Sequence, residues 1–480
     1  MVLKEFPAYG ENAGNTNSEF GENSLSRNEI VARMQELAPA GQQTLDPDTH
    51  NILRLYTGDL AASCSAEAQE DYDRYHDTER RQISLCVEAL KEVHEDKTIL
   101  VTGGTGLIGT VLMRELSRLN PAAIVSLSRG LTVPLELVPG VSYQTADITD
   151  SARLDEVFDE VKPDIVYHLA ANKYPGLAEE AVAATLTTNI MGTENVLASV
   201  KKHGVDRLAY ASTGKTIRPF SPDTYAASKK ASEWLLADFA ASNDTLCSAG
   251  RFTHVVDHSD FMRRLHGWID AGDPISLHGA EVSLYVQSAT ESAQLLMNST
   301  LDAERGNLQV NAIRDLGWPV GLANLALGAI IKTQSEAAIY FSGFKPGYEE
   351  ESYIDLYDPM TAGDVSPLIS SLEAKSAQPS KFSNDVDSFP LSFVSTPQLR
   401  QSLQTLKSAC IQNQAAGDIN ALKDDLSWTM LEARLLSLPL SVVERAAKRI
   451  QIRHAFDVPK EHAQIDQTVL SVLDARTPNQ

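Results

Sequence analysis

The stretch TILVTGGTGLIGT, residues 98–110, restricts the possible fold of this chain more than any other part of its sequence. A short apolar run suited to a buried strand is followed by Gly103, Gly106 and Gly109, which open a helical pattern. In that context the glycines predict a dinucleotide-binding turn rather than a glycine-rich turn without a ligand, which is the alternative. Gly103 would allow the tight turn, Gly106 would let the backbone approach a diphosphate, and Gly109 would let helix and strand pack closely.

Apolar runs and helical segments alternate downstream of this loop. The buried strands that we expect are AIVSLSR, DIVYHLA and RLAYAST, because continuous apolar runs suit a sheet covered on both faces. Between them lie the helical patterns TVLMRELSRL, SARLDEVFDEV and NIMGTENVLASVKKH. The alternation predicts an α/β fold, a Rossmann-type doubly wound parallel sheet, with helical N- and C-terminal extensions.

The chain is expected to have four parts. An N-terminal extension would cover 1–95, partly disordered over 8–26 and then helical. The α/β domain would cover 96–350, with a cofactor half at 96–240 and a substrate part at 241–350. A Ser-rich linker at 351–395 would lead to a helical appendage at 396–480, with helices starting at Thr396-Pro397, near Ile419 and at Ser441.

Charge and cysteine content exclude several classes of partner. Against 41 Lys and Arg stand 64 Asp and Glu, a net charge of −23, which repels phosphate backbones and anionic lipid. We therefore expect no nucleic-acid partner and no membrane partner. The four cysteines are widely spaced, and no signal peptide or membrane-spanning run is recognised, so we expect a cytoplasmic protein.

The end of the second predicted strand bears on the choice of cofactor. It carries Ser128 and Arg129, and an arginine there suits a 2′-phosphate, so we expect NADP, with NAD the alternative. A solvated surface arginine is the other interpretation of Arg129. Asp147 could reach the adenine amino group or cap the helix that follows. Further residues expected to line the cofactor are Thr105, Leu107, Ile108 and Ile148.

A Tyr-x-x-x-Lys pair, Tyr225 and Lys229, provides candidate catalytic groups on one face of a predicted helix. A phenol has an ordinary pKa near 10, and a nearby ammonium would lower it by favouring the phenolate. Tyr225 could then take a hydroxyl proton while hydride leaves for the cofactor. Ser212 and Thr213, at the end of the preceding strand, could bond the same hydroxyl. The pair also occurs on ordinary solvated helices, which is the alternative.

Four stretches of the sequence occur in one order: the glycine loop, DIVYHLAANKYPGLAEE with TTNIMGTENVL, STGKTIRP with YAASK, and IYFSGFKPGYEEE. In these stretches and their order, residues 98 to about 350 resemble the extended short-chain dehydrogenase/reductases. More narrowly, they resemble the polysaccharide-biosynthesis branch, which includes the inverting UDP-N-acetylglucosamine 4,6-dehydratases.

The resemblance implies several further roles. Ala170 and Ala171 would line the cofactor, and Asn189 would be the structural or proton-relay asparagine. Lys215 would take the proton α to a new ketone. The residues implied near the substrate are Lys173, Arg251, His254 and Lys345. A metal site at His254 and His258 is not expected, because a third ligand is missing.

The chain departs from the branch at three positions. Gly214 stands where the dehydratases carry an aspartate that helps water leave. Lys345 and Leu284 stand where they carry arginines that hold the UDP diphosphate; lysine keeps the charge without the bidentate fork, and leucine loses both.

The leading hypothesis is an enzyme that oxidises a hydroxyl of a nucleotide-activated sugar to a ketone, epimerises or dehydrates it, and returns the hydride. Its partner would be a small sugar or nucleotide sugar, and we expect a homo-oligomer. A simple NADP-dependent dehydrogenase or ketoreductase, acting on a sugar, cyclitol or nucleoside without a diphosphate, is the alternative. A non-catalytic cofactor-binding scaffold is a third.

Overall fold

A computed structural model describes residues 2–3, 25–42, 44–131, 134, 136–348, 364–453 and 460–477. The loop predicted over 8–26 lies outside these residues except for its last two positions. The chain divides into two units. Unit 1 contains Met1–Arg80, His254–Gln287 and Gly317–Lys345, and unit 2 contains Arg81–Thr253, Ser288–Leu316 and Pro346–Gln480.

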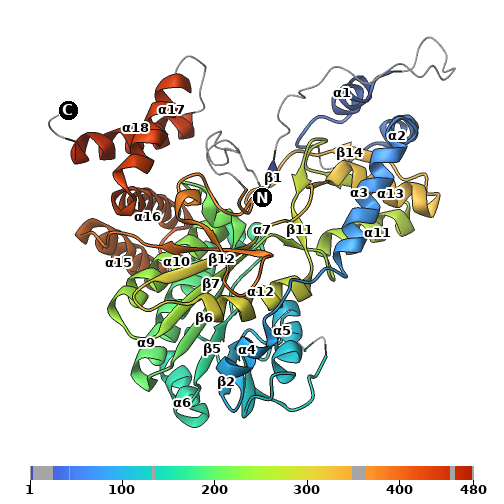
Figure 1. Ribbon diagram of the computed structural model, residues 1–480. Coiled ribbons are helices and arrows are strands. Elements are labelled where there is room, and N and C mark those ends of the chain that lie inside the picture. Colours follow the sequence, from blue (N-terminus) through green and yellow to red (C-terminus); the bar gives the residue numbers. More distant parts are fainter. Residues whose placement is uncertain are drawn as a thin grey trace. The chain divides into compact units, whose positions relative to one another are not determined.

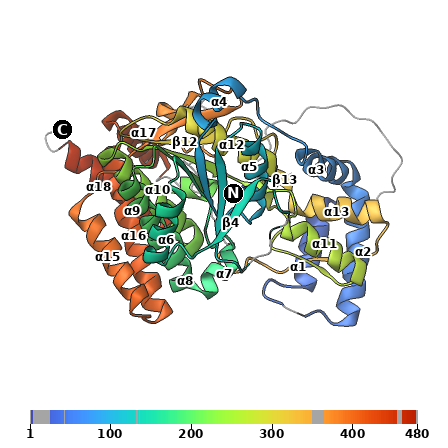
Figure 2. The ribbon, with the colours of Figure 1, turned by 90° about the horizontal axis from the view of Figure 1, so that it is seen from below.

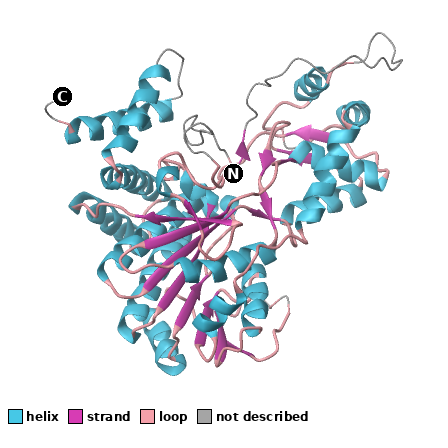
Figure 3. Ribbon diagram, viewed as in Figure 1, coloured by secondary structure: helices cyan, strands magenta, loops and turns pink. Residues whose placement is uncertain are grey.

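A nine-stranded sheet forms the centre of unit 2, in the order β15-β16-β12-β7-β6-β5-β2-β3-β4 (Figure 3). The strands from β12 to β4 pair in parallel. Their bounds are β2 Thr98–Thr102, β3 Ala123–Ser128, β4 Val141–Thr145, β5 Ile165–His168, β6 Arg207–Thr213, β7 Leu246–Phe252 and β12 Leu308–Ile313. The strand order reverses between β2 and β5, which confirms the predicted doubly wound sheet and marks the usual ligand crevice of such folds.

Helices cover both faces of this sheet (Figure 1). On one face α12 (Ala289–Asp302) contacts β6, β7 and β12 and packs beside α4 (Val87–His94) and α5 (Leu107–Ser117). On the other face α10 (Thr224–Ser242) contacts the same strands beside α9 (Gly192–His203), which packs on α6 (Ser151–Val161). Because both faces are covered, β5 is buried along its whole length, as the apolar runs predicted.

Two strands extend the sheet beyond the parallel part. β16 (Val386–Leu391) pairs antiparallel with β12, and β15 (Gln378–Pro379) pairs antiparallel with β16. Both lie in the stretch that we expected to be a linker. Serine composition suggested the linker, whereas the buried alternation of Val386, Phe389 and Leu391 is what the edge of β12 required. Residues 288–316, which we expected in the substrate part, instead form α12, which covers this sheet, and β12, which is one of its strands.

Three of the C-terminal helices described begin at or near their predicted positions, and a fourth, α18, was not predicted. They are α15 (Pro397–Ile411), α16 (Ala416–Ser437), α17 (Leu440–Arg453) and α18 (Lys460–Arg476). The hydroxyl of Thr396 caps α15 by accepting from Leu399 N at 3.1 Å. α15 and α16 pack on α8 (Val182–Leu186), and α16 also contacts α10 (Figure 2). These helices therefore form a further layer over the α10 face of the sheet.

Unit 1 is a helical core edged by short strands. Its helices are α1 (Arg27–Leu37), α2 (Pro47–Ser63), α3 (Ser65–Thr78), α11 (Asp260–Ala271) and α13 (Leu322–Thr333). Its paired strands are β1 (Val2–Leu3), β10 (Ser283–Leu284) and β13 (Val320–Gly321), then β8 (His254–Val255) with β11 (Val286–Gln287), and β9 (Ile275–Leu277) with β14 (Ile339–Phe341). α3 and α13 touch at Gly328, where an added Cβ would lie 2.6 Å from the carbonyl oxygen of Ala68. The N-terminal helices therefore fold with segments far along the chain.

We expect Phe389→Ala to lower the free energy of unfolding by about 3–5 kcal/mol, because Phe389 is fully buried on β16. Pro390→Ala, at the exposed neighbouring position, should change it by less than about 0.5 kcal/mol. Urea unfolding of both variants measures the difference. Equal and small effects would contradict the pairing of β16 with the sheet.

Candidate active site

The glycine loop has the geometry that its sequence predicted. Gly103 follows β2 with φ +74°, and an added Cβ would lie 2.7 Å from Ala170 N, at the end of β5. An added Cβ on Gly109 would lie 2.6 Å from Gly103 O, so α5 and β2 meet without room for a side chain. Gly104 is a third close approach, because its Cβ would lie 2.4 Å from Ser126 Oγ. Our prediction omitted Gly104; the signal was the Gly-Gly pair itself.

The N-terminus of α5 has no side chain that competes for its backbone N–H groups. Gly106 is the N-cap, no side chain caps the helix, and no acidic residue lies in the first turn. Leu107 and Ile108 are half-buried there, and Thr105 is buried. Free N–H groups at a helix N-terminus, with no carboxylate nearby, suit a diphosphate. The residues present therefore fit a dinucleotide cofactor.

The ends of β3 and β4 place the residues expected near the adenosine. Ser128 is half-buried and Arg129 is exposed at the end of β3. Asp147 accepts from Thr149 N at 2.9 Å, while Asp150, not Asp147, caps α6. Asp150 therefore performs the helix capping that we considered as the second role of Asp147. The side chain of Ile148 is buried against Gly192, where an added Cβ would lie 2.6 Å from Ile148 Cδ1.

Asn189 has a structural role in this chain. It lies in a π-helical turn, η1 (Thr187–Met191), and its Oδ1 accepts from Asn172 N at 2.8 Å. Its Nδ2 donates to Asn172 O at 3.0 Å and to Ser228 Oγ at 2.8 Å. Asn189 thus connects Asn172, in the loop after β5 that also contains Ala170 and Ala171, to Ser228 on α10. His168 is a satisfied core residue, with both ring nitrogens bonded to the hydroxyls of Thr102 and Thr193.

Tyr225 begins α10 beside the end of β6. Asp223 caps the helix by accepting from Ala226 N at 2.7 Å, and Glu179, on α7 (Pro175–Glu180), accepts from Thr224 N at 2.6 Å. Four residues later Lys229 Nζ donates to Ala211 O at 2.5 Å and lies 4.0 Å from the centre of the Tyr210 ring. The two side chains expected to act together therefore project from one face of α10 onto β6.

The electrostatics of this pair differ from our expectation. Burial raises the pKa of Tyr225 to about 12, opposed by the hydroxyl of Thr213 and the charge of Lys215. Burial also lowers the pKa of Lys229 to about 7. The Lys229 amine is directed at the Ala211 carbonyl, and Lys215 is the cation that favours the Tyr225 phenolate. Within the chain alone the phenol is therefore not acidified, which corrects the prediction.

Lys215 lies on η2 (Gly214–Ile217), a 3-10 turn that directly follows β6. Its Nζ is 3.4 Å from Gly347 O and 3.9 Å from Asp223 Oδ2, and 15% of its side chain is exposed. Thr213 Oγ1 accepts from Lys215 N at 3.4 Å. Thr213, Lys215 and Tyr225 are thus brought together, as the sequence suggested.

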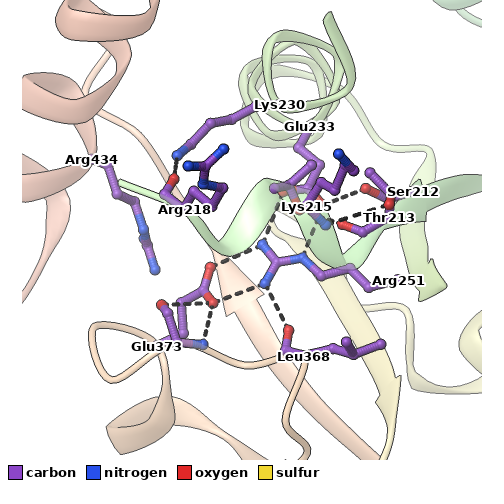
Figure 4. A network of polar contacts seen from close by, with 12 residues as sticks. Ser212, Thr213, Lys215, Arg218, Lys230, Glu233, Arg251, Leu368, Glu373 and Arg434 are labelled. Carbon is purple, nitrogen blue, oxygen red and sulfur yellow. Dashed lines mark hydrogen bonds and ion pairs between the residues drawn. The ribbon is translucent and has the colours of Figure 1, made fainter. Parts of the chain in front are cut away.

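Two other predicted contacts with substrate are corrected. Ser212 is buried, and its hydroxyl donates to Glu233 Oε1 at 2.6 Å, not toward Tyr225. The guanidinium of Arg251 is 1% exposed and is held by the carboxylates of Glu233 and Glu373 (Figure 4). Neither group has a free polar atom for a substrate, because each is occupied by partners distant in sequence.

The remaining predicted substrate residues fall in both units. Lys173, in unit 2, is exposed and lies 5.3 Å from the centre of the Tyr174 ring. His254 and Lys345 belong to unit 1. His254 Nε2 lies 3.2 Å from Ser259 Oγ, and burial lowers the pKa of its imidazole to about 4, so it is neutral at pH 7. Lys345 is exposed.

Comparison with known proteins gives the family. Residues 99–358 match the family described as "Polysaccharide biosynthesis protein". The chain belongs to this family. Residues beyond 358, including β16 and all of the C-terminal helices, lie outside the match.

Individual relatives cover only part of the chain. It is 29% identical over 293 residues to capsular polysaccharide biosynthesis protein CapD of Staphylococcus aureus, covering 56% of this chain and 47% of that protein. It is 31% identical over 169 residues to the inverting UDP-N-acetylglucosamine 4,6-dehydratase of Campylobacter jejuni, covering 33% and 49%. This chain thus spans about half the length of these relatives. The solved structure of Pen from Bacillus thuringiensis is similar in fold, with a TM-score of 0.51 at 22% identity, over 62% of this chain and 87% of that one.

The described residues contain no group of three or more His, Cys, Asp or Glu side chains that could hold a metal ion. None of the helices described there is both long and apolar enough to span a bilayer.

We expect Lys229→Met to flatten the pH dependence of stability. Since burial lowers the pKa of Lys229 from 10.5 to about 7, the unfolded chain binds its proton between these values while the folded chain does not. This lysine should make the free energy of unfolding rise with pH over that window, by up to about 1.4 kcal/mol per pH unit.

Urea unfolding at several pH values between about 7 and 10 measures the slope. Lys201→Met, at an exposed position on α9, is the matched control and should keep the wild-type slope. Identical slopes for Lys229→Met and the wild-type protein would contradict a neutral, buried Lys229.

Proposed function

We propose that this chain is a nicotinamide-dependent enzyme that oxidises a hydroxyl of a sugar, then epimerises or dehydrates the keto intermediate and returns the hydride. The observation that carries the proposal is the grouping of Thr213, Lys215 and Tyr225 at the carboxyl end of β6. In the sheet, only β5 separates β6 from β2, which bears the glycine loop. Names of relatives point to nucleotide sugars as the substrate class, since one is called a UDP-N-acetylglucosamine dehydratase.

The dinucleotide would lie over the N-terminus of α5, held by backbone N–H groups of the glycine loop and bordered by Ala170 and Ala171. When bound, the oxidised nicotinamide supplies the hydride acceptor and a positive charge that favours the phenolate. We propose NADP, with NAD the alternative, because exposed Arg129 follows β3 where a 2′-phosphate would lie.

The side chains divide the proton transfers between them. Tyr225 takes the proton of the substrate hydroxyl, and the Thr213 hydroxyl and the Lys215 charge both stabilise its phenolate. Once Tyr225 holds the hydroxyl proton, Lys215 releases its own proton to solvent, to which 15% of its side chain is exposed. The neutral amine then takes the proton on the carbon next to the new ketone, since ketone formation makes that C–H acidic. Lys229 keeps α10 in register with β6 through its bond to Ala211 O.

A simple NADP-dependent dehydrogenase or ketoreductase is the second candidate, and the surroundings of Gly214 favour it. Gly214 offers no acid, and an added Cβ would lie 2.7 Å from Leu368 Cδ2, so an apolar side chain fills the adjacent space. The cation that we expected Arg251 to offer a diphosphate is already paired. Both features suit a reaction without loss of water on a substrate without a diphosphate.

We expect the wild-type protein, incubated in heavy water with UDP-N-acetylglucosamine or dTDP-glucose, to incorporate deuterium at a carbon next to the oxidised centre. Lys215→Met should remove the label and slow, without abolishing, reduction of bound cofactor, because the base is lost and the Tyr225 phenolate keeps only the Thr213 hydroxyl as support. Tyr225→Phe should reduce both by about 100-fold or more, because the general base for the first step is lost. Mass spectrometry of the sugar and the absorbance of reduced nicotinamide measure the two steps.

Net accumulation of free NADPH with unlabelled product would contradict the redox-neutral proposal and support the second candidate. Cofactor affinity, measured by titration, is the control for both variants and should stay at the wild-type value.

We expect Arg129→Ala to weaken NADP binding by roughly ten- to a hundredfold and to leave NAD binding unchanged, because a charge-assisted contact with the 2′-phosphate is removed. Calorimetric titration with each cofactor measures both affinities. Arg153→Ala, which removes a half-buried arginine paired with Glu156 on α6, is the matched control. Equal losses for NADP and NAD, or no loss for either, would contradict this role for Arg129.

A further inference from the structure

We propose that the chain beyond the family match acts as a positioning clamp on the loop between β6 and α10. The β6–α10 loop, residues 214–223, carries Lys215 and leads into Tyr225. The C-terminal clamp consists of residues 366–376 and α16, and it grips the loop through Glu373 on one side and Trp428 on the other. The effect of the clamp on catalysis rests on the proposed function, whereas the contacts between the clamp and the loop do not depend on it.

The first grip begins at Arg251, whose five N–H groups are all used (Figure 4). Nε and Nη2 donate to the two oxygens of Glu233, both at 3.0 Å. Nη1 and Nη2 donate to the two oxygens of Glu373 at 2.8 and 2.9 Å, and Nη1 also donates to Leu368 O at 3.2 Å. A buried guanidinium is stable only with such pairing, so the segment that bears Glu373 is part of the fold and not a loose tail.

Glu233 connects Arg251 to the β6–α10 loop through hydrogen bonds. Its Oε1 accepts from Ser212 Oγ at 2.6 Å and from Thr216 Oγ1 at 3.0 Å. Ser212 and Thr216 flank Lys215, so the carboxylate that is fixed by Arg251 also fixes the turn from which Lys215 projects. Removing the Glu373 carboxylate would leave Arg251 paired with Glu233 alone. The Arg251 and Glu233 side chains could then shift together, and the turn that Glu233 holds would shift with them.

The second grip lies at the other end of the loop. The ring of Trp428, on α16, stacks on Phe220 with ring centres 4.1 Å apart and planes 18° apart. Lys423 Nζ, also on α16, donates to Pro222 O. Pro222 directly precedes Asp223, the N-cap of α10, so α16 fixes the backbone two residues before the catalytic helix and three before Tyr225.

The space between the grips is packed. A cavity of about 20 Å³ remains among the charged groups, which is room for about one water molecule. Its charged lining comprises Lys230, Glu233, Arg251, Glu373 and Arg434. Lys230 Nζ donates to Arg218 O and, at 2.9 Å, to Pro219 O, so this cation also holds the loop. These charged groups therefore hold the loop in place, and the cavity among them is too small to admit a separate anionic ligand.

The test compares Glu373→Gln and Trp428→Ala in the full chain by hydrogen–deuterium exchange and steady-state kinetics. Exchange of peptides covering residues 213–224 should become about tenfold faster in both variants, because each loses one grip on the loop. With nucleotide sugars, kcat should fall by about 10- to 100-fold while KM stays within about twofold, since misplaced reacting groups cost rate rather than binding.

Two controls separate positioning from general stability. Trp428→Phe keeps an aromatic ring against Phe220 and should restore both exchange and kcat. Arg400→Ala removes exposed contacts of α15 with Ser395, away from the loop, and should match the wild-type protein.

Unchanged exchange at 213–224 in both variants, or equal changes in Arg400→Ala, would overturn the clamp. Faster exchange with kcat at the wild-type value would overturn its role in positioning. Absence of turnover by the wild-type protein on every nucleotide sugar would count against the proposed function, and the exchange measurement would still decide the clamp.

Discussion

A single buried guanidinium organises much of unit 2. Arg251 is 1% exposed on β7, and a charge so placed requires full pairing, which Glu233 and Glu373 supply. The Arg251 guanidinium outweighs the effect of burial and lowers the pKa of Glu373 to about 2. Because Glu373 comes from beyond the family match, the central sheet and the C-terminal segment form one structure. Helices that resembled an appendage in sequence are thereby part of the domain that holds the candidate site.

A second constraint is steric and acts at the strand-order reversal. β2 and β5 leave the sheet side by side, and Gly103 lies against Ala170 so closely that any side chain would collide. This contact brings the ends of β2 and β5 together next to the glycine loop, and the end of β6 brings Thr213 and Lys215 to the same edge of the sheet. The site is thus a consequence of where parallel strands end, combined with glycines that let backbones approach.

Residues whose roles depend on local geometry could be predicted from the sequence. The glycine loop needs only a strand, a turn and a helix, and Tyr225 and Lys229 need only helical spacing. Ser212 and Arg251 were misassigned because their partners are 21 and up to 122 residues away. Spacing places Lys229 on the correct face of α10 for Tyr225. Only the packed structure directs its amine to Ala211 O and buries the phenol, and this burial raises the pKa of Tyr225 to about 12.

By itself the sequence determined the doubly wound sheet, the glycine turn and the presence of the first three C-terminal helices, because each is encoded in apolar periodicity and short-range turn chemistry. The tertiary structure decided the joining of the N-terminal helices to residues 254–287 and 317–345 and the addition of β16 to the sheet. It also decided which charged side chains are paired with one another in the interior. These features depend on which distant segments bury one another's side chains and neutralise one another's charges, and no local pattern carries that information.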